Sequence, residues 1–398
     1  FIKFEIVLPE LITDLRLKIW IRTNQKQLPE VVVNKDGGIT KTITNLDALA
    51  KIEDLICTNS YLVTINELIR HMPNLKTLVC KDNSLFELDI SKNIKLEVLD
   101  CYHNRLKNLD ISKNIKLIKL DCSHNQLNNL DVSKNIKITH LECWFNQLRN
   151  LDVSKNIKLE VLSCYYNLLT NLDVSKNIEL TGLTCSNNSL FELDISKNIK
   201  LEFLSCRENR LNKLNMNTEL KHLGCEKNRL TNLDLTNNIN LITLDCSNNQ
   251  LNNLNLSKNI ELKTLYCKDN TLNNLDISSI LNLQKLNCCN QAEGFILYLT
   301  NKQKGKFTEK NYCNAILEEK DGSICEIEWL DIYPNPTTGK FFIESKFFTD
   351  EIKILNLAGE VLYRETLNDE KTEIDISNLP AGVYLVITKG KIGKVVKN

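Results

Sequence analysis

Cysteine recurs along the middle of this sequence at a nearly fixed interval. Counting from Cys80, the next six cysteines follow at steps of 21 residues, Cys225 follows after 19, and steps of 21 then resume as far as Cys288. The surrounding residues repeat with it, in the pattern L-x-x-L-x-C-x-x-N-x-L-x-x-L-D. A period of about 20 to 50 residues is the signature of architectures in which similar units stack on one another. We therefore predict a solenoid of about eleven units over residues 52–288.

Each unit begins with a short segment in which Leu and Cys alternate with residues that vary from unit to unit. In one unit, Leu99 and Cys101 alternate with Val98, Asp100 and Tyr102. Successive side chains of a strand point to opposite faces, so one set faces the core and the other faces solvent. The second half of the unit copies the first with an offset of ten residues, and 21 residues leave little room for a long helix. The expected fold is mainly β, with a second short extended segment in place of a helix.

The first half of the unit resembles the leucine-rich-repeat consensus. The matching positions in one unit are Leu96, Leu99, Cys101, Asn104 and Leu106, with cysteine in a place that leucine usually takes. Free cysteine behaves as a small buried hydrophobe, and parallel side chains on in-register strands do not approach each other as a disulfide requires. We therefore predict unreactive free thiols along this column. The asparagine is expected to bond to backbone groups of neighbouring units inside the turn.

The segments that flank the repeats do not share their spacing. Residues 1–51 are expected to form an N-terminal cap with a short helix at residues 10–20, and residues 289–326 a polar, irregular C-terminal cap and linker. A disulfide of Cys289 with either Cys313 or Cys325 would close the open end of the solenoid. Connectivity cannot be deduced from sequence, so both pairings remain open.

From residue 327 the chain changes to short runs of β-branched and aromatic residues. About seven runs, separated by turn signals roughly every 8 to 12 residues, predict a small immunoglobulin-like β-sandwich over residues 327–398. Four motifs stand in order within it. They are YPNPTTG at residues 333–339, ILNLAG at 354–359, LPAGVYL at 379–385 and KVVK at 394–397.

Together these four motifs resemble the C-terminal sorting domain of type IX secretion substrates. The resemblance implies export across the outer membrane of a Bacteroidetes-type bacterium, with the domain read by the type IX secretion translocon and usually cleaved off. It also implies a mature protein that is secreted or anchored at the outer-membrane surface. The residues that carry the resemblance include Pro334, Asn335, Pro336, Gly339, Gly382, Tyr384, Lys394 and Lys397.

Charge and motif content exclude several classes of function. The chain has 50 basic and 50 acidic residues, which argues against nucleic acid as a partner, and no apolar run reaches the roughly 18 to 20 residues of a membrane span. The sequence motifs of nucleophilic hydrolases, zinc proteases, nucleotide-binding loops and EF-hands are missing. We therefore expect no catalytic residues, no cofactor and no metal site, and a role in binding.

The outward positions of the repeats vary from unit to unit, and aromatic residues concentrate there on consecutive units. The expected ligand-binding residues are Tyr102, His103, Asp121, His140, Glu142, Trp144, Phe145, Tyr165, Tyr166 and Phe203. Because Trp and Tyr dominate interface hot spots, such a patch suits a protein or glycan ligand in adhesion. Two alternatives remain. In the first, the aromatic residues merely stabilise the sheet. In the second, the solenoid is a structural spacer or assembly element of the cell envelope without a specific ligand.

Overall fold

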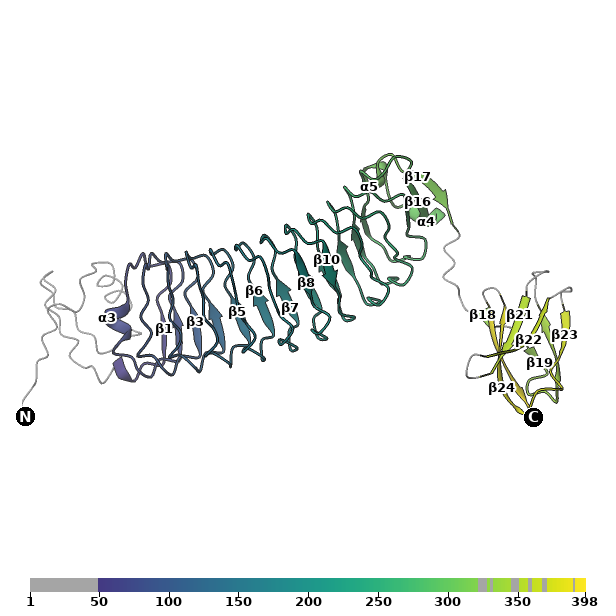
Figure 1. The fold of residues 1–398 in the computed structure, drawn as a ribbon, viewed down its shortest axis with the longest axis horizontal. Helices are drawn as coiled ribbons and strands as arrows, with labels where there is room; N and C mark the ends of the chain where they lie inside the picture. Colours follow the sequence, from purple (N-terminus) through teal and green to yellow (C-terminus); the bar gives the residue numbers. More distant parts are fainter. Residues whose placement is uncertain are drawn as a thin grey trace, which may run out of the picture. The chain divides into compact units, whose positions relative to one another are not determined.

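The computed structural model describes residues 49–320, 328–329, 332–344, 351–356, 360–366, 371–388 and 391–398. The chain divides into two compact units, Phe1–Lys320 and Asp321–Asn398, each of which is described by itself (Figure 1). The helix expected at residues 10–20 lies outside the described residues, as do most of the expected N-terminal cap and Cys325.

One face of the first unit is a parallel sheet to which each repeat contributes a strand of three residues (Figure 1). Leucines at the strand centres lie in register, as Leu99 does between Leu78 and Leu120. A short helix, α3 (Asn66–Ile69), lies between the first two strands. In spatial order, the strands described for this sheet are β1 (Asp54–Ile56), β2 (Thr77–Val79), β3 (Val98–Asp100), β4 (Lys119–Asp121), β5 (His140–Glu142), β6 (Val161–Ser163), β7 (Gly182–Thr184), β9 (Phe203–Ser205), β11 (His222–Gly224), β12 (Thr243–Asp245), β13 (Thr264–Tyr266) and β15 (Lys285–Asn287).

The core of this unit is a column of leucine, isoleucine, valine and cysteine side chains. In and after β3, Leu99 and Cys101 are buried, whereas Val98, Asp100 and Tyr102 are partly exposed, which confirms the predicted alternation. Among the described residues, twelve cysteines from Cys57 to Cys288 are buried free thiols, so the predicted absence of disulfides along the column is also confirmed.

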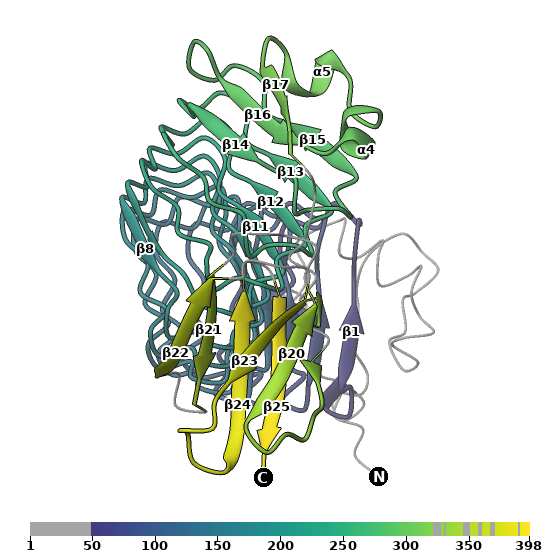
Figure 2. The same ribbon diagram turned by 90° about the vertical axis from the view of Figure 1, so that its right-hand side faces the viewer.

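The second half of each repeat forms hydrogen-bonded strands in only a few units. These are β8 (Glu192–Asp194) and β10 (Lys213–Asn215), which pair with each other, and β14 (Asn274–Asp276). Figure 2, a view along the array, separates β8 from the sheet strands β11 to β13. Most other units close this segment with a turn in which an aspartate accepts a backbone N–H, as Asp110 does from Ser112 at 2.9 Å. Between β2 and β15, where the chain is described throughout, no helix occurs.

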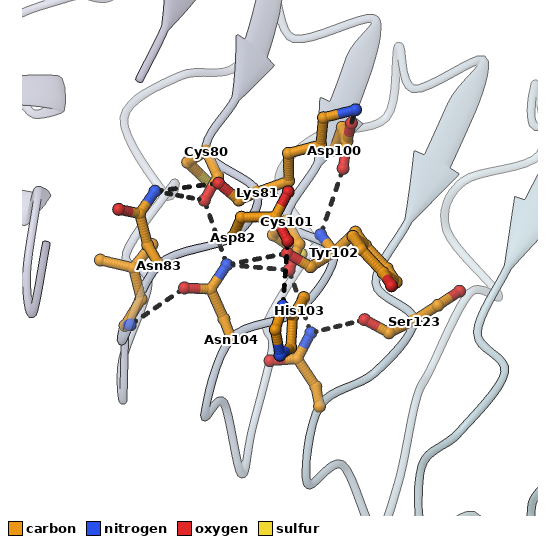
Figure 3. A network of polar contacts seen from close by, with 12 residues as sticks. Cys80, Lys81, Asp82, Asn83, Asp100, Cys101, Tyr102, His103, Asn104 and Ser123 are labelled. Carbon is orange, nitrogen blue, oxygen red and sulfur yellow. Dashed lines mark hydrogen bonds and ion pairs between the residues drawn. The ribbon is translucent and has the colours of Figure 1, made fainter. Parts of the chain in front are cut away.

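A first column of asparagine joins adjacent units through side-chain amides (Figure 3). Asn104 Nδ2 donates to the carbonyl oxygens of Cys80 and Cys101, both at 3.1 Å, and Asn104 Oδ1 accepts the Leu85 N–H at 3.0 Å. The same three contacts recur at Asn125 and beyond. These bonds satisfy peptide groups that would otherwise be unpaired inside the turn, which confirms the expected role of this asparagine.

A second column of asparagine is buried completely or almost completely. Asn156 Nδ2 donates to the carbonyl oxygens of Val132 at 3.1 Å and of Asn135 at 2.9 Å, and Asn156 is 0% exposed. Equivalent pairs of bonds are made by Asn93, Asn114, Asn135, Asn177, Asn198 and Asn259. Each unit is therefore tied to the previous one on two sides of the core.

Replacing Asn156 with alanine is expected to lower the free energy of unfolding of the first unit by about 1 to 3 kcal/mol, the contribution of two hydrogen bonds. The carbonyls of Val132 and Asn135 would each lose one of two donors, because the N–H groups of Asn135 and Ile138 still donate to them. Chemical denaturation of the full chain followed by circular dichroism measures the effect. Asn129→Ala, at an exposed position, is the matched control and should stay within about 0.5 kcal/mol of the wild type. Equal midpoints for the two variants would contradict the role of this column.

Regular elements close the end of the array, whereas the sequence suggested an irregular segment. β16 (Ile296–Leu299) and β17 (Ile316–Glu319) extend the sheet that begins with β14, and the helices α4 (Asn301–Lys304) and α5 (Glu309–Tyr312) lie between them in the chain. The expectation was wrong because this segment loses the 21-residue spacing but keeps the apolar alternation of a strand, with Leu297 and Leu299 buried.

Two glutamines and one disulfide complete this end of the array. Gln291 Nε2 donates to the Cys267 carbonyl and Gln303 Nε2 to the Ile277 carbonyl, both at 2.8 Å, so glutamine takes the place of asparagine at the end of each column. Cys289 and Cys313 form a disulfide with their Cα atoms 5.1 Å apart. This is one of the two pairings that the sequence left open.

The second unit consists of two sheets around one apolar core, which confirms the predicted small β-sandwich. The core includes Phe341 and Ile374 from one sheet and Ile354, Val386 and Val395 from the other. The described strands of the larger sheet, in spatial order, are β18 (Glu328–Trp329), β25 (Lys391–Lys397), β24 (Gly382–Thr388), β21 (Glu351–Leu355) and β22 (Val361–Thr366); those of the smaller sheet are β19 (Ile332–Tyr333), β20 (Lys340–Glu344) and β23 (Lys371–Asp375).

Candidate binding surface

Aromatic side chains that follow β3 to β6 form one continuous group, here called the aromatic surface. The rings of Trp144 and Tyr165 stack with their centroids 4.9 Å apart and their planes 8° from parallel. His124 and Phe145 stack at 4.5 Å and 11°. The members of the aromatic surface are Tyr102, His103, His124, Trp144, Phe145, Tyr165 and Tyr166. His124 is not among the candidates taken from the sequence, although it occupies the same position in its unit as His103 and Phe145.

A small residue lets the rings meet across a whole unit. Ser123 occupies the position between Tyr102 and Trp144 and is 0% exposed. The rings of Tyr102 and Trp144 lie 5.4 Å apart, although their units are not adjacent. The aromatic surface is therefore continuous across the unit that contributes no large ring at this position.

The turn residues of the aromatic surface have a left-handed backbone. His103, His124, Phe145 and Tyr166 have φ angles between 52° and 55°. At the same turn position most other units carry Asp or Asn: Asp82, Asn187, Asn248, Asp269 and Asn290. Asp and Asn tolerate this conformation better than bulky side chains do. The difference in conformational free energy is on the order of 1 kcal/mol. Phe145 and Tyr166 are 46% and 44% exposed, so a large part of each ring stays accessible to a ligand.

Three carboxyl groups form a column beside the rings. The strand register places Asp121 next to Asp100 on one side and next to Glu142 on the other. Burial raises the pKa of Asp121 to about 6, and the charges of Glu142 and Asp100 act in the same direction. The Ser123 N–H, which donates to Asp121 Oδ1 at 2.9 Å, opposes this shift. The column therefore holds like charges close together next to an apolar surface.

Replacing Asp121 with asparagine is expected to raise the free energy of unfolding at pH 7.5 by about 1 to 3 kcal/mol and to change it little at pH 4. The pKa of Asp121 is raised in the folded chain above its ordinary value of 3.8, so the folded state binds the proton more tightly and stability falls as pH rises from about 4 to about 6. Asparagine removes the charge and keeps an oxygen for the Ser123 N–H. Denaturation at the two pH values measures the difference.

Asp110→Asn is the control for this prediction. Hydrogen bonds from Ser112 lower the pKa of Asp110, so its contribution to stability is present at neutral pH and is lost as pH falls. The control is therefore expected to show no gain at pH 7.5. A gain of equal size in both variants would mean that the effect does not come from the environment of Asp121.

Two of the sequence candidates lie apart from the aromatic surface. His140 forms no ring contact with it in the described residues, and its Nδ1 lies 2.8 Å from Thr139 Oγ1. Phe203 is on β9, two strands further along the sheet than β6, and its ring lies 6.2 Å from that of His222. Asp121 and Glu142 flank the rings as the sequence suggested.

In the second unit, segments distant in the sequence converge around Asn335. Asn335 Nδ2 donates to the Lys394 carbonyl at 2.5 Å, and Asn335 Oδ1 accepts the Val396 N–H at 2.9 Å. Lys397 Nζ donates to the Ser377 carbonyl at 2.8 Å. The YPNPTTG segment therefore lies against the last strand of the chain, and that strand is tied to the turn before LPAGVYL.

The remaining candidate residues of the second unit lie in or beside these segments. The peptide bonds before Pro334 and Pro336 are cis. Gly339 has a φ of +144°, and a Cβ there would lie 2.5 Å from Ser377 Oγ, so only glycine fits. Gly382 begins β24, where the hydroxyl of Tyr384 donates to the Pro380 carbonyl at 2.6 Å. Part of the ILNLAG motif, residues 357–359, lies outside the described residues.

In the described part of the chain, no group of three or more His, Cys, Asp and Glu side chains is placed to hold a metal ion. No helix among the described residues has the length and apolarity that crossing a bilayer requires.

Most of the chain is similar to solved leucine-rich-repeat structures. The functional domain of InlJ from Listeria monocytogenes, which includes a cysteine ladder, is 26% identical with a TM-score of 0.62, over 91% of this chain and 93% of that one. The internalin InlF of Listeria monocytogenes is 16% identical with a TM-score of 0.57, over 71% and 91%. YopM of Yersinia pestis is 22% identical with a TM-score of 0.52, over 65% and 80%. InlF and YopM share only the fold. No curated protein matches the sequence.

The first unit is thus an internalin-like leucine-rich-repeat solenoid, a fold that typically serves as a non-enzymatic binding scaffold. Residues 331–398 match the family of secretion system C-terminal sorting domains. The protein is therefore a leucine-rich-repeat solenoid protein with a type IX secretion C-terminal sorting domain. This domain implies interaction with the type IX secretion machinery and a location outside the cell or at the outer-membrane surface.

Proposed function

We propose that this protein binds a macromolecular ligand, a protein or a glycan, on the aromatic surface and acts in adhesion at the cell surface. In this proposal, residues 52–288 display the surface, residues 1–51 and 289–326 cap the array, and residues 327–398 direct export. The observation that carries the proposal is the run of aromatic residues in left-handed turn positions on four consecutive units. Backbone preference disfavours bulky residues such as Phe145 and Tyr166 there, so their presence calls for a role outside backbone stability.

The contacts within the aromatic surface suit it to binding. Stacking fixes Trp144 against Tyr165 and His124 against Phe145, so these rings lose little conformational freedom when a ligand docks. Aromatic side chains also bury large areas and have polar groups at their edges, which explains their enrichment at interface hot spots. The adjacent carboxyl groups of Asp121 and Glu142 supply hydrogen-bond acceptors at the rim.

The double replacement of Trp144 and Tyr165 by alanine tests the proposal. The assay uses surfaces and partner cells to which the wild-type bacterium attaches better than a strain that lacks the gene. Attachment of the strain that carries the double variant is measured on these surfaces and cells. The variant is expected to attach like the deletion strain, because the loss of a single hot spot of about 2 kcal/mol already weakens binding roughly 30-fold. The purified chain should remain folded, with its melting temperature lowered only by the loss of the stacked pair, and its amount on the cell surface should match the wild type.

Phe86→Ala is the matched control, since Phe86 is 54% exposed and does not belong to the aromatic surface. It is expected to leave attachment unchanged. Wild-type attachment by the double variant would refute the role of the aromatic surface. Wild-type attachment by the deletion strain would refute adhesion as the function.

A second candidate function is that of a structural spacer in the cell envelope. It is favoured by the contacts that the rings make with each other, because cross-strand aromatic pairs stabilise a sheet even without a ligand. In that case the double variant would lose thermal stability but not attachment, and the purified wild type would self-associate without any added ligand.

A further inference from the structure

The outward side of the parallel sheet in the first unit has a second feature, a hollow of about 270 Å³ over β9, β11, β12 and β13. It opens where Gly224 stands at the outward position of β11. The neighbouring strands carry Ser205 and Asp245 at the positions paired with Gly224, and Tyr266 follows on the next strand. The missing side chain of Gly224 therefore creates the space, and the side chains of adjacent units form its walls.

Ring side chains supply the apolar part of these walls. The ring of Phe203, a residue that is 45% exposed, lies 6.2 Å from that of His222, with the planes at 45°. Tyr266 also lines the hollow. His222 Nδ1 is 2.9 Å from Thr243 Oγ1, a contact that holds the imidazole in place. The hollow thus offers flat apolar surfaces to a ligand that has an apolar face.

Charged side chains supply both donors and acceptors in the same hollow. The Arg207 guanidinium lies 3.7 Å from the Glu226 carboxylate, and both residues line the hollow together with Asp245. Burial raises the pKa of Glu226, and the charge of Asp245 adds to this, whereas Arg207 acts against it. A guanidinium only donates and a carboxylate only accepts, whereas a hydroxyl group does both. A ligand with several hydroxyl groups is therefore the type that can satisfy all three side chains.

We propose that this hollow binds one pyranose ring of a glycan. A sugar ring has apolar C–H faces for the rings of Phe203 and Tyr266, and hydroxyl groups around its edge for Arg207, Glu226 and Asp245. The volume lies slightly below the range of roughly 300 to 1,000 Å³ that is common for drug-sized ligands, which fits a single sugar unit. The hollow does not share residues with the aromatic surface, so this inference stands even if that surface has another role.

The test is a titration of the isotope-labelled full chain with the methyl glycosides of glucose, galactose, mannose and N-acetylglucosamine. The amide resonance of Gly224 is the reporter. At least one glycoside is expected to shift it in a saturable manner. Gly224→Val should weaken binding about ten-fold or more, because its side chain would occupy the hollow. A Cβ at this position meets only Glu226 Oε2 at 3.4 Å and Ser205 Oγ at 3.8 Å, so the fold accommodates it.

One control separates this site from other effects. The Trp144→Ala, Tyr165→Ala double variant should bind the glycoside normally, since it alters only the aromatic surface. Phe203→Ala, which removes one wall without filling the space, should weaken binding as well, and it serves if Gly224→Val lowers the melting temperature.

Three results would overturn the proposal. The first is the absence of a saturable shift at Gly224 with every glycoside. The second is wild-type affinity in both Gly224→Val and Phe203→Ala. The third is a response to N-acetyl-lysine amide or methylguanidinium, and not to the glycosides, which would assign the hollow to a cationic side chain of a protein ligand.

Discussion

Alkylation of the buried free thiols from Cys57 to Cys288 in the folded chain is expected to be at least about a thousand times slower than in the denatured chain. The thiolate is the reactive form of cysteine. Burial raises the pKa of Cys57, Cys185 and Cys288 from 9.0 to about 12, so at pH 8 the thiolate fraction falls about a thousand-fold. Exclusion of the reagent from the core slows the reaction further. The thiols between these three are equally buried, and the pKa of each is raised.

Iodoacetamide labelling followed by peptide mapping measures this protection for each cysteine. In mild denaturant, Cys57 and Cys288 should react before Cys164, because units at the ends of a stack open more readily than units in the middle. The same chain in strong denaturant is the control and should label at all twelve positions. Rapid labelling of Cys164 in the native chain would contradict the buried column.

Removing residues 321–398 is expected to abolish delivery of the protein to the cell surface or medium. This unit contains the match to the sorting-domain family, and no comparable motif occurs in the repeats. Fractionation of the producing bacterium with intact-mass analysis measures the outcome. The wild type is expected as a surface or medium form, cleaved near residue 327, and the truncated chain only in the cell interior. Equal surface amounts of the two would show that export does not depend on this unit.

A pair of glycine variants distinguishes loss of the folded domain from loss of length. Gly339→Ala brings a Cβ to 2.5 Å from Ser377 Oγ and 3.0 Å from Ser377 Cα, at a φ of +144°. Gly382→Ala brings a Cβ no closer than 3.8 Å, to the Tyr384 hydroxyl. Export of Gly339→Ala should fall strongly and that of Gly382→Ala should remain near the wild type. The opposite order would place the determinant of export at Gly382 itself.

The fold of the repeats could be predicted because period and burial pattern agree at every unit. The spacing of Cys80 to Cys288 and the alternation around Leu99 were sufficient for the sheet, the core column and the absence of disulfides along it. The cap at the end could not be predicted in detail, because β16 and β17 keep an alternation but lose the spacing. The second asparagine column was visible only as an offset copy, since sequence does not reveal that Asn156 bonds to two carbonyls of the preceding unit, those of Val132 and Asn135.

The candidate site was predicted less completely than the fold. Trp144, Tyr165 and their neighbours follow from matching positions on adjacent units. His124 belongs to the aromatic surface because its ring stacks on that of Phe145. Phe203 lies apart from the aromatic surface because it lines the hollow at Gly224. Such relations arise from side-chain geometry between units, which a repeat pattern does not encode.

The repeated contacts between units also bear on how such a gene can change. Most units meet the next through the same leucine and cysteine packing and the same asparagine hydrogen bonds. The shortened unit before Cys225 keeps the first asparagine column, since Asn228 Oδ1 accepts the Leu211 N–H at 3.0 Å, whereas Asn217 of the second column donates to the carbonyls of Asn198 and Leu201. Recombination that copies or deletes whole units therefore creates no new kind of internal junction. The exposed residues of each unit are free to differ, so such events can reshuffle the outer face of the protein while its folding remains intact.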